Sequence, residues 1–143
     1  MLPDRPVRIV LVEDEGADVL FMRKAFERGT LGFEVVACSS GPAFMAHMSE
    51  VASKQEPPDL VLLDLNLPGM SGLDILTQLR NGDVFPHVVV VVLTSSSYRR
   101  EVTEVYVAGA NAFVTKPARL ADLDQLVAQI ESFWLGLALL PYQ

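Results

Sequence analysis

The 143-residue chain contains a single cysteine, Cys38, which excludes the internal disulfide framework of small secreted proteins. It has no apolar run near the roughly 18 residues that a membrane-spanning helix requires. Its amino-terminal segment also lacks the apolar stretch of a signal peptide. We therefore expect a cytoplasmic protein with no membrane partner.

Basic residues are scarce, with 11 Lys and Arg against 18 Asp and Glu, for a net charge of −7. Because nucleic-acid binding needs clustered basic side chains, we expect no nucleic-acid partner. The chain also lacks a glycine-rich phosphate loop, which argues against a nucleotide cofactor. Half of the residues are hydrophobic and the length suits one domain.

Short apolar segments alternate with segments of helical spacing along the whole chain. The segments that predict strands are Val7–Val12, Phe33–Cys38, Leu60–Leu63, Val88–Leu93 and Ala112–Thr115. Helices are expected at Ala17–Arg28, from Pro42, at Leu73–Arg80 after a Ser71 cap, near Arg99–Ala108 and after Pro117. The all-valine segment Val88–Val92 is typical of a strand covered on both faces. This alternation predicts a three-layer, doubly wound α/β sandwich around a parallel sheet.

Polar residues stand directly after four of the predicted strands. Glu13 and Asp14 follow the first, Asp64 the third, Thr94 the fourth and Lys116 the fifth. Ligands of such sheets bind beyond the carboxyl ends of the strands, so we expect these side chains to share one rim. Carboxylates brought this close repel one another, and a bound cation relieves the repulsion. A small, oxygen-only ligand set favours Mg²⁺.

A rim of this composition suits phosphoryl transfer. The Asp64 carboxylate is then the nucleophile and forms an aspartyl phosphate. Lys116 and Thr94 can bind the oxygens of the transferring group. Each residue by itself is an ordinary loop, cap or turn residue, and Thr94 with the serines that follow it could simply cap a helix. Their occurrence after four different strands favours the functional interpretation.

The sequence resembles the receiver domain of two-component response regulators from about Val7 to Trp134. The matching segments are Val-Glu13-Asp14, Leu-Leu-Asp64-Leu-Asn66-Leu-Pro68-Gly-Met70-Ser-Gly72, Leu-Thr94-Ser95-Ser96 and Gly109-Ala110-Asn111-Ala-Phe113-Val-Thr-Lys116-Pro117. The resemblance implies a flavodoxin-like fold with strand order 2-1-3-4-5. It also implies that Asp64 accepts phosphate from a phosphohistidine on a sensor kinase. The protein would then assist its own phosphorylation and dephosphorylation without being a turnover enzyme.

The same resemblance implies a role for each matching residue. Mg²⁺ would be bound directly by Asp14 and Asp64, through water by Glu13, and by the backbone carbonyl of Asn66. Thr94 would move toward the phosphoryl group, and Lys116 would be its counter-ion. The residues expected to tune reactivity are Asn66, Ser95 and Ser96.

Two further expectations concern the fifth strand and the proline that follows it. The resemblance implies a cis peptide bond between Lys116 and Pro117. Phe113, where many relatives have Tyr, corresponds to an aromatic residue that rotates inward during switching. By strand alternation its side chain points away from Lys116, toward the surface around the fourth and fifth helices. An ordinary half-buried phenylalanine is the alternative interpretation.

A narrower resemblance points to the single-domain regulators paired with bacterial and cyanobacterial phytochromes. It is carried by Asn66, Tyr106, Asn111 and the segment Ile130–Leu135 with Leu139-Leu140-Pro141 after it. It implies a bacteriophytochrome histidine kinase as partner, a receiver domain at residues 1–134 and no output domain.

The apolar tail, residues 135–143, would either fold back on its own domain or pack on a second subunit. The resemblance favours a homodimer. The candidate contact residues are Phe133, Trp134, Leu135, Leu137, Leu139, Leu140 and Pro141.

Two other functions use similar residues. A phosphatase of the haloacid dehalogenase type also has an Asp nucleophile and an acidic pair. That family places its nucleophile after the first strand and normally reads Asp-x-Asp there, with the second Asp as acid. Here Glu13 and Asp14 come first, and Asn66 stands where the second Asp would be. A receiver-like docking module that is never phosphorylated would not need the complete set of site residues.

Overall fold

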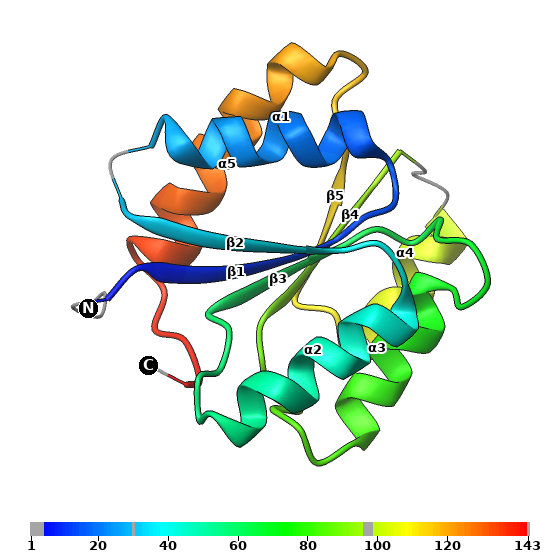
Figure 1. Ribbon diagram of the computed structural model, residues 1–143. Coiled ribbons are helices and arrows are strands. Elements are labelled where there is room, and N and C mark those ends of the chain that lie inside the picture. Colours follow the sequence, from blue (N-terminus) through cyan, green and yellow to red (C-terminus); the bar gives the residue numbers. More distant parts are fainter. Residues whose placement is uncertain (1–4, 30, 96–98, 143) are drawn as a thin grey trace.

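The computed structural model describes residues 5–29, 31–95 and 99–142. The strands are β1 (Val7–Val12), β2 (Phe33–Cys38), β3 (Leu60–Leu63), β4 (Val90–Thr94) and β5 (Ala112–Thr115). The helices are α1 (Gly16–Glu27), α2 (Gly41–Ser53), α3 (Gly72–Asn81), α4 (Arg99–Val107) and α5 (Leu123–Ile130). The strands form one parallel sheet in the order β2-β1-β3-β4-β5 (Figure 1). The predicted fold class and strand order are confirmed.

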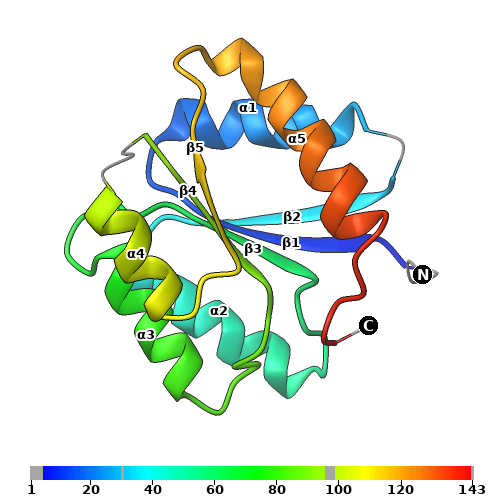
Figure 2. The same ribbon diagram turned by 180° about the vertical axis from the view of Figure 1, so that it is seen from behind.

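The sheet is covered on both faces. Helices α1 and α5 lie side by side on one face, and α2, α3 and α4 cover the other (Figures 1 and 2). Because side chains alternate along a strand, Ile9 and Leu11 of β1 join the core beneath α1 and α5, whereas Val10 and Val12 join the opposite core. The central strand β4 is buried at every position, as the valine segment predicts.

Local sequence signals account for several boundaries. The Ser71 hydroxyl accepts a hydrogen bond from the Asp74 N–H at 3.2 Å and caps α3. The Ser40 hydroxyl caps α2 in the same way, with Pro42 in the first turn. Strand β4 begins two residues later than predicted, because Val88 belongs to the preceding turn and donates its N–H to the Phe85 carbonyl.

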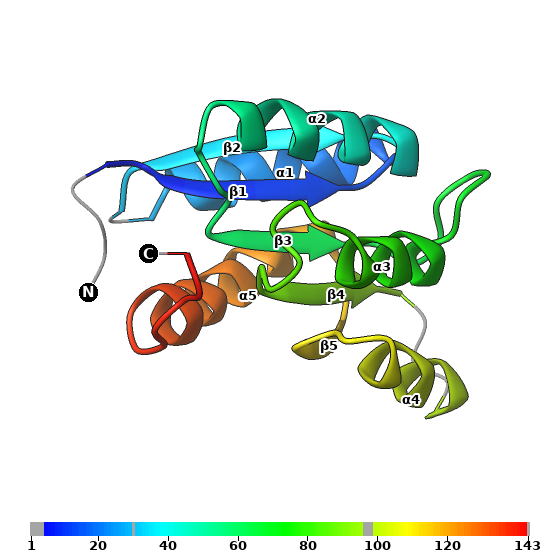
Figure 3. The same cartoon turned by 90° about the horizontal axis from the view of Figure 1, so that it is seen from below.

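The C-terminal tail folds back on its own domain. After α5 the chain continues through a π-helical turn, Glu131–Leu135, and then runs past the amino ends of the strands (Figure 3). Leu135 and Leu140 are buried in the core beneath α1 and α5. Tyr142 reaches the opposite core, where its ring lies 5.2 Å from that of Phe85.

This course of the tail corrects part of the predicted dimer contact. Leu135 and Leu140 pack inside their own chain and are not available to a second subunit. The half-buried Trp134 packs against the same core. Phe133, Leu137 and Leu139 are exposed, as is Pro141. Within the described part of the chain, no helix has the length and apolar character needed to cross a membrane.

Candidate functional site

The hydrogen-bond ladder of the sheet holds the site residues at the carboxyl ends of the strands. The Glu13 N–H donates to the Cys38 carbonyl at 3.0 Å, and the Asp64 N–H donates to Val12 at the same distance. The Lys116 N–H donates to the Thr94 carbonyl at 2.8 Å. Backbone bonds therefore fix the positions of these residues, even though they lie beyond the strands.

Three carboxylates meet at this rim. Glu13, Asp14 and Asp64 each offer an oxygen atom, and these atoms lie within 4.8 Å of one another. Asp14 is exposed, whereas Glu13 and Asp64 are only 3% and 7% exposed. The Glu13 Oε2 accepts the N–H groups of Asp14 and Glu15 at 3.1 and 3.3 Å. Burial raises the pKa of Glu13 to about 8, an effect that Asp64 reinforces and Lys116 opposes.

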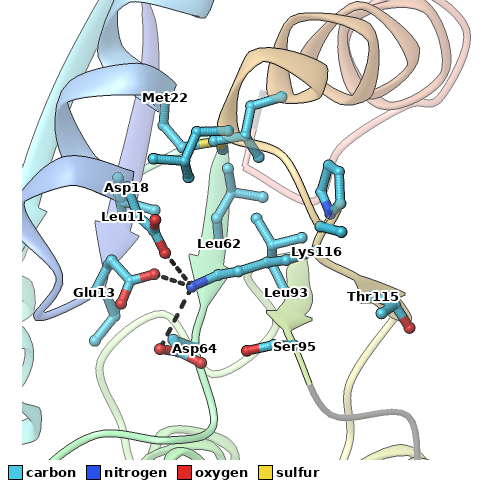
Figure 4. A pocket seen from close by; sticks show the side chains of 15 residues that line it. Leu11, Glu13, Asp18, Met22, Leu62, Asp64, Leu93, Ser95, Thr115 and Lys116 are labelled. Carbon is cyan, nitrogen blue, oxygen red and sulfur yellow. Dashed lines mark hydrogen bonds and ion pairs between the residues drawn. The ribbon is translucent and has the colours of Figure 1, made fainter.

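The Lys116 ammonium lies between the acidic side chains (Figure 4). It donates hydrogen bonds to Glu13 and to Asp18, with 2.7 Å to the Asp18 Oδ2. The Asp64 Oδ2 is farther away, at 3.6 Å. Burial lowers the pKa of Lys116, but the hydrogen bonds to Asp18 and Glu13 outweigh burial and leave that pKa above its usual range.

Asp18 is absent from the residues that the sequence analysis assigned to the site. It lies in the first turn of α1, which begins directly after the β1 loop. Side chains of a helix point back toward its amino end, and here that end faces the rim. An acidic residue in the first turn after the Glu13-Asp14 pair was the available signal, but it is equally typical of a residue that only stabilises a helix start.

Asn66 connects Asp64 to Thr94. Its backbone N–H donates to the Asp64 Oδ1 at 3.2 Å, and its side-chain amide donates to the Thr94 hydroxyl at 3.1 Å. Thr94 is fully buried at the end of β4. Ser95 is exposed beside the site, whereas Ser96 lies outside the described residues. Asn66 therefore bridges the Asp64 carboxylate and the Thr94 hydroxyl through these two hydrogen bonds.

Residues 9–128 match the family of the response regulator receiver domain. The chain belongs to this family. Over 138 residues it is 35% identical to response regulator Rcp1 of Synechocystis sp., covering 95% of this chain and 94% of Rcp1. The receiver match does not favour a dehalogenase-type phosphatase.

Solved structures of response regulators, two of them phytochrome response regulators, share the fold of this receiver. The phosphorylated cyanobacterial phytochrome response regulator RcpA superposes with a TM-score of 0.88 at 35% identity, covering 96% of this chain and 99% of RcpA. The Mn²⁺-bound form of Rcp1 superposes with a TM-score of 0.84 at 36% identity, covering 95% of this chain and 99% of Rcp1. The bacteriophytochrome response regulator AtBRR gives 0.69 at 33%, covering 94% and 97%. The chain is thus a receiver-type response regulator related to phytochrome response regulators.

The peptide bond between Lys116 and Pro117 in this receiver is trans, and no cis peptide bond occurs among the described residues. The predicted cis bond is wrong for this structure. A trans bond is the more stable form before proline by roughly 0.5–1 kcal/mol. With the bond trans, the Lys116 ammonium still reaches Glu13, Asp18 and Asp64.

Phe113 is half-buried on the sheet face covered by α2, α3 and α4. Its backbone N–H, on the edge strand β5, donates to the Tyr106 hydroxyl of α4 at 3.1 Å. A half-buried ring suits both interpretations of the sequence, so the switching role of Phe113 stays a prediction.

A cavity of about 500 Å³ adjoins the acidic cluster between α1 and the start of α5. One side is charged, with Glu13, Asp64 and Lys116, and the other is apolar, with Met22 and Leu62 among its residues (Figure 4). The cavity leaves room for a bound group beside the buried carboxylates of Glu13 and Asp64.

The ligand atoms of the receiver site fit a divalent metal ion. The clustered donors are all carboxylate oxygens, as hard cations prefer. Burial and the nearby Asp64 raise the pKa of Glu13, so a bound divalent cation would stabilise its ionised form. Asp14 is exposed, so an ion bound there would keep contact with water, as Mg²⁺ and similar ions require.

Proposed function

We propose that Asp64 accepts a phosphoryl group from a phosphohistidine of a sensor histidine kinase, and that the chain acts in a phosphorelay. The observation that carries the proposal is the position of Asp64. Its carboxylate lies within 4.8 Å of those of Glu13 and Asp14, and a lysine ammonium lies 3.6 Å away. An ionised carboxylate needs no general base to act as a nucleophile.

In the proposed reaction an oxygen of the Asp64 carboxylate attacks the phosphorus atom. A bond from oxygen to phosphorus forms as the bond from phosphorus to the imidazole nitrogen breaks, and the imidazole keeps the electron pair. Lys116 and Thr94 bind oxygens of the transferring group, whose negative charge they stabilise. Thr94 ends β4, which lies beside β3, and Lys116 follows β5, which lies beyond β4.

Mg²⁺ is the proposed cofactor. Asp14, Asp64 and the backbone carbonyl of Asn66 would hold it, with Glu13 acting through water. When bound, the ion neutralises negative charge on the carboxylates and on the phosphoryl oxygens. The acidic cluster supports a divalent ion at this place, and the choice of Mg²⁺ rests on the oxygen-only ligand set.

Switching would follow from the loss of one hydrogen bond. Thr94 would leave the amide of Asn66 and move toward the phosphoryl group, and Phe113 would rotate inward from its half-buried position. The hydrogen bond that this step would break joins the Asn66 side-chain amide to the Thr94 hydroxyl at 3.1 Å. Asn66, Ser95 and Ser96 remain the residues proposed to set the lifetime of the aspartyl phosphate.

The proposed donor is a kinase of the bacteriophytochrome type, in the cytoplasm. The likeness to RcpA and AtBRR, which are phytochrome response regulators, supports this choice. We also propose that residues 1–134 form the receiver domain and that residues 135–143 form its tail. The match to 94% of the length of Rcp1 supports this division.

The test of phosphorylation uses acetyl phosphate as a small donor. Wild type with Mg²⁺ is expected to gain one phosphoryl group by intact-mass analysis, and EDTA is expected to prevent the gain. Asp64→Asn should gain nothing. Phosphotransfer from a panel of purified sensor kinases then identifies the donor. A phosphorylated Asp64→Asn variant, or no transfer from any phytochrome kinase, contradicts the corresponding part of the proposal.

A homodimer is proposed through the exposed apolar residues of the tail. Leu137 and Leu139 are 76% and 82% exposed, so their replacement leaves the core intact. The double variant Leu137→Ser/Leu139→Ser is expected to halve the molar mass that light scattering records for wild type, without changing the urea midpoint. A monomeric wild type, or an unchanged mass in the variant, rejects this interface.

A further inference from the structure

Asp18 and the proposed phosphoacceptor Asp64 both lie close to the Lys116 ammonium. The Asp18 side chain is 18% exposed and comes from the first turn of α1. Its Oδ2 lies 2.7 Å from the Lys116 Nζ, whereas the Oδ2 of Asp64 lies 3.6 Å from the same atom. In Figure 4 the Asp18 carboxylate lies above the ammonium and the Asp64 carboxylate below it, with Glu13 between them. The Lys116 ammonium therefore lies nearer to Asp18 than to Asp64.

The hydrogen bonds of Lys116 favour the side of α1. An ammonium group has three N–H donors, and Lys116 directs one to Glu13 and one to Asp18. A separation of 3.6 Å is too long for a hydrogen bond to Asp64, although charge attraction remains. The Lys116 ammonium is thus bound more closely by Asp18 than by Asp64, the proposed phosphoacceptor.

We infer that Asp18 is a positioning residue that holds Lys116 away from Asp64 until a phosphoryl group arrives. The inference rests on the proposed function, because Lys116 must give up Asp18 to bind the phosphoryl oxygens. Asp18 therefore stabilises the unphosphorylated protein more than the transition state or the phosphorylated product. It slows phosphorylation and lowers the phosphorylated fraction at a given donor concentration.

A simpler role for Asp18 is the stabilisation of the helix start, since an acidic side chain there interacts favourably with the helix dipole. That role does not depend on Lys116. Glu15 provides the matched control, because it carries the same charge and directly precedes α1, its side chain is exposed, and it makes no capping hydrogen bond.

The kinetic experiment compares wild type, Asp18→Asn, Asp18→Glu and Glu15→Gln with acetyl phosphate and Mg²⁺. At saturating donor, Asp18→Asn should be phosphorylated about fivefold faster than wild type, which is the effect of one lost ion pair. Asp18→Glu should keep the wild-type rate, because it restores the carboxylate. Glu15→Gln should change only the donor concentration that gives half the maximal rate. If Asp18→Asn is no faster than Glu15→Gln at saturation, the inference is wrong.

A double-mutant cycle tests the contact without phosphorylation. Urea midpoints are measured in EDTA for Asp18→Asn, Lys116→Met and the double variant. The two changes should be non-additive, whereas Glu15→Gln and Lys116→Met should be additive. Additive effects of Asp18→Asn and Lys116→Met overturn the inference. If wild type accepts no phosphate, the proposed function fails, and the cycle still decides whether Asp18 holds Lys116.

Discussion

The two ends of β3 carry buried aspartates with opposite surroundings. Asp59 precedes the strand and is 3% exposed, and Asp64 follows it and is 7% exposed. Arg5 binds both oxygens of Asp59 at 2.9 and 3.0 Å, and the Arg8 N–H adds a third hydrogen bond at 2.8 Å. Asp64 accepts the Asn66 N–H, and Lys116 is 3.6 Å away.

The comparison shows that partners, rather than residue type or burial, separate a structural carboxylate from a reactive one. A bidentate guanidinium satisfies both oxygens of Asp59, which leaves that carboxylate little capacity to bind another group. Asp64 shares Lys116 with Glu13 and Asp18, so its charge is poorly compensated. Incomplete compensation costs stability, and it leaves Asp64 able to bind a cation and to attack phosphorus.

The largest difference between the two ends of β3 should appear when the cationic side chain beside each aspartate is removed, Lys116 beside Asp64 and Arg5 beside Asp59. Lys116→Met is expected to reduce the rate of phosphorylation by acetyl phosphate by about 100-fold or more, the usual effect of losing one donor to a developing anion. Arg5→Met should leave the rate per folded molecule within about twofold of wild type, because its effect is confined to Asp59. Equal losses in both variants would show that the two ends are coupled.

Replacement of the aspartates themselves should destabilise the protein at Asp59 but not at Asp64. Asp59→Asn is expected to lower the free energy of unfolding by about 2–3 kcal/mol, because Arg5 loses a charged, bidentate partner. Asp64→Asn in EDTA should leave that free energy unchanged or raise it, because it removes one of several repelling carboxylates. Urea titrations followed by circular dichroism measure both. A destabilised Asp64→Asn of similar size would remove the distinction.

The pH dependence of stability should come from the end that holds Asp64. Glu13 has a pKa of about 8 in the folded protein, above the ordinary value of 4.5. Between these values the folded state binds more protons than the unfolded state, so the free energy of unfolding falls as pH rises. In EDTA, wild type should therefore lose stability from about pH 5 to about pH 8 relative to Glu13→Gln.

Saturating Mg²⁺ should reverse this trend, because the ion binds ionised carboxylates and stabilises the folded state. Urea midpoints of wild type and Glu13→Gln at each pH, with EDTA or with Mg²⁺, make the measurement. Since other titrating groups are shared, only the difference between the two proteins counts. A difference that does not change with pH would show that Glu13 is ionised throughout.

The smallest expected effect lies at the amino ends of the strands, where the C-terminal tail packs. The Tyr142 hydroxyl accepts the His87 N–H at 3.0 Å and fastens the tail to the turn before β4. Tyr142→Phe should lower the free energy of unfolding by about 0.5–1 kcal/mol and leave phosphorylation unchanged. Differential scanning calorimetry and the acetyl phosphate assay measure the two effects. A slower phosphorylation of Tyr142→Phe would connect the tail to the site.

Much of the fold could be predicted because its signals are local. The valine segment before Thr94 predicted a buried strand, and Ser71 predicted the start of α3. Parallel strands then required the residues at the carboxyl ends of β1, β3, β4 and β5 to share a rim, which is where Glu13, Asp64, Thr94 and Lys116 lie. The roles of these residues stay predictions.

Other features depended on contacts that no local pattern encodes. The pairing of Asp18 with Lys116 joins residues 98 positions apart, and many alternative partners were available to each. The direction of the tail depended on whether Leu135 and Leu140 found space in their own core. The isomer of the Lys116–Pro117 bond depended on a preference of roughly 1 kcal/mol, which surroundings can reverse.

The sequence by itself determined the parallel sheet, the rim and most of the residues gathered there, because the strands and their ends follow from hydrophobic patterning. The strand order was implied by the resemblance to receiver domains. Only the tertiary structure decided which carboxylate each cation pairs with. Arg5 reaches Asp59 and leaves it satisfied, whereas Lys116 is drawn toward Asp18 and Glu13. Charge pairing is set by distances of a few ångströms between side chains, and those distances exist only once the chain has folded.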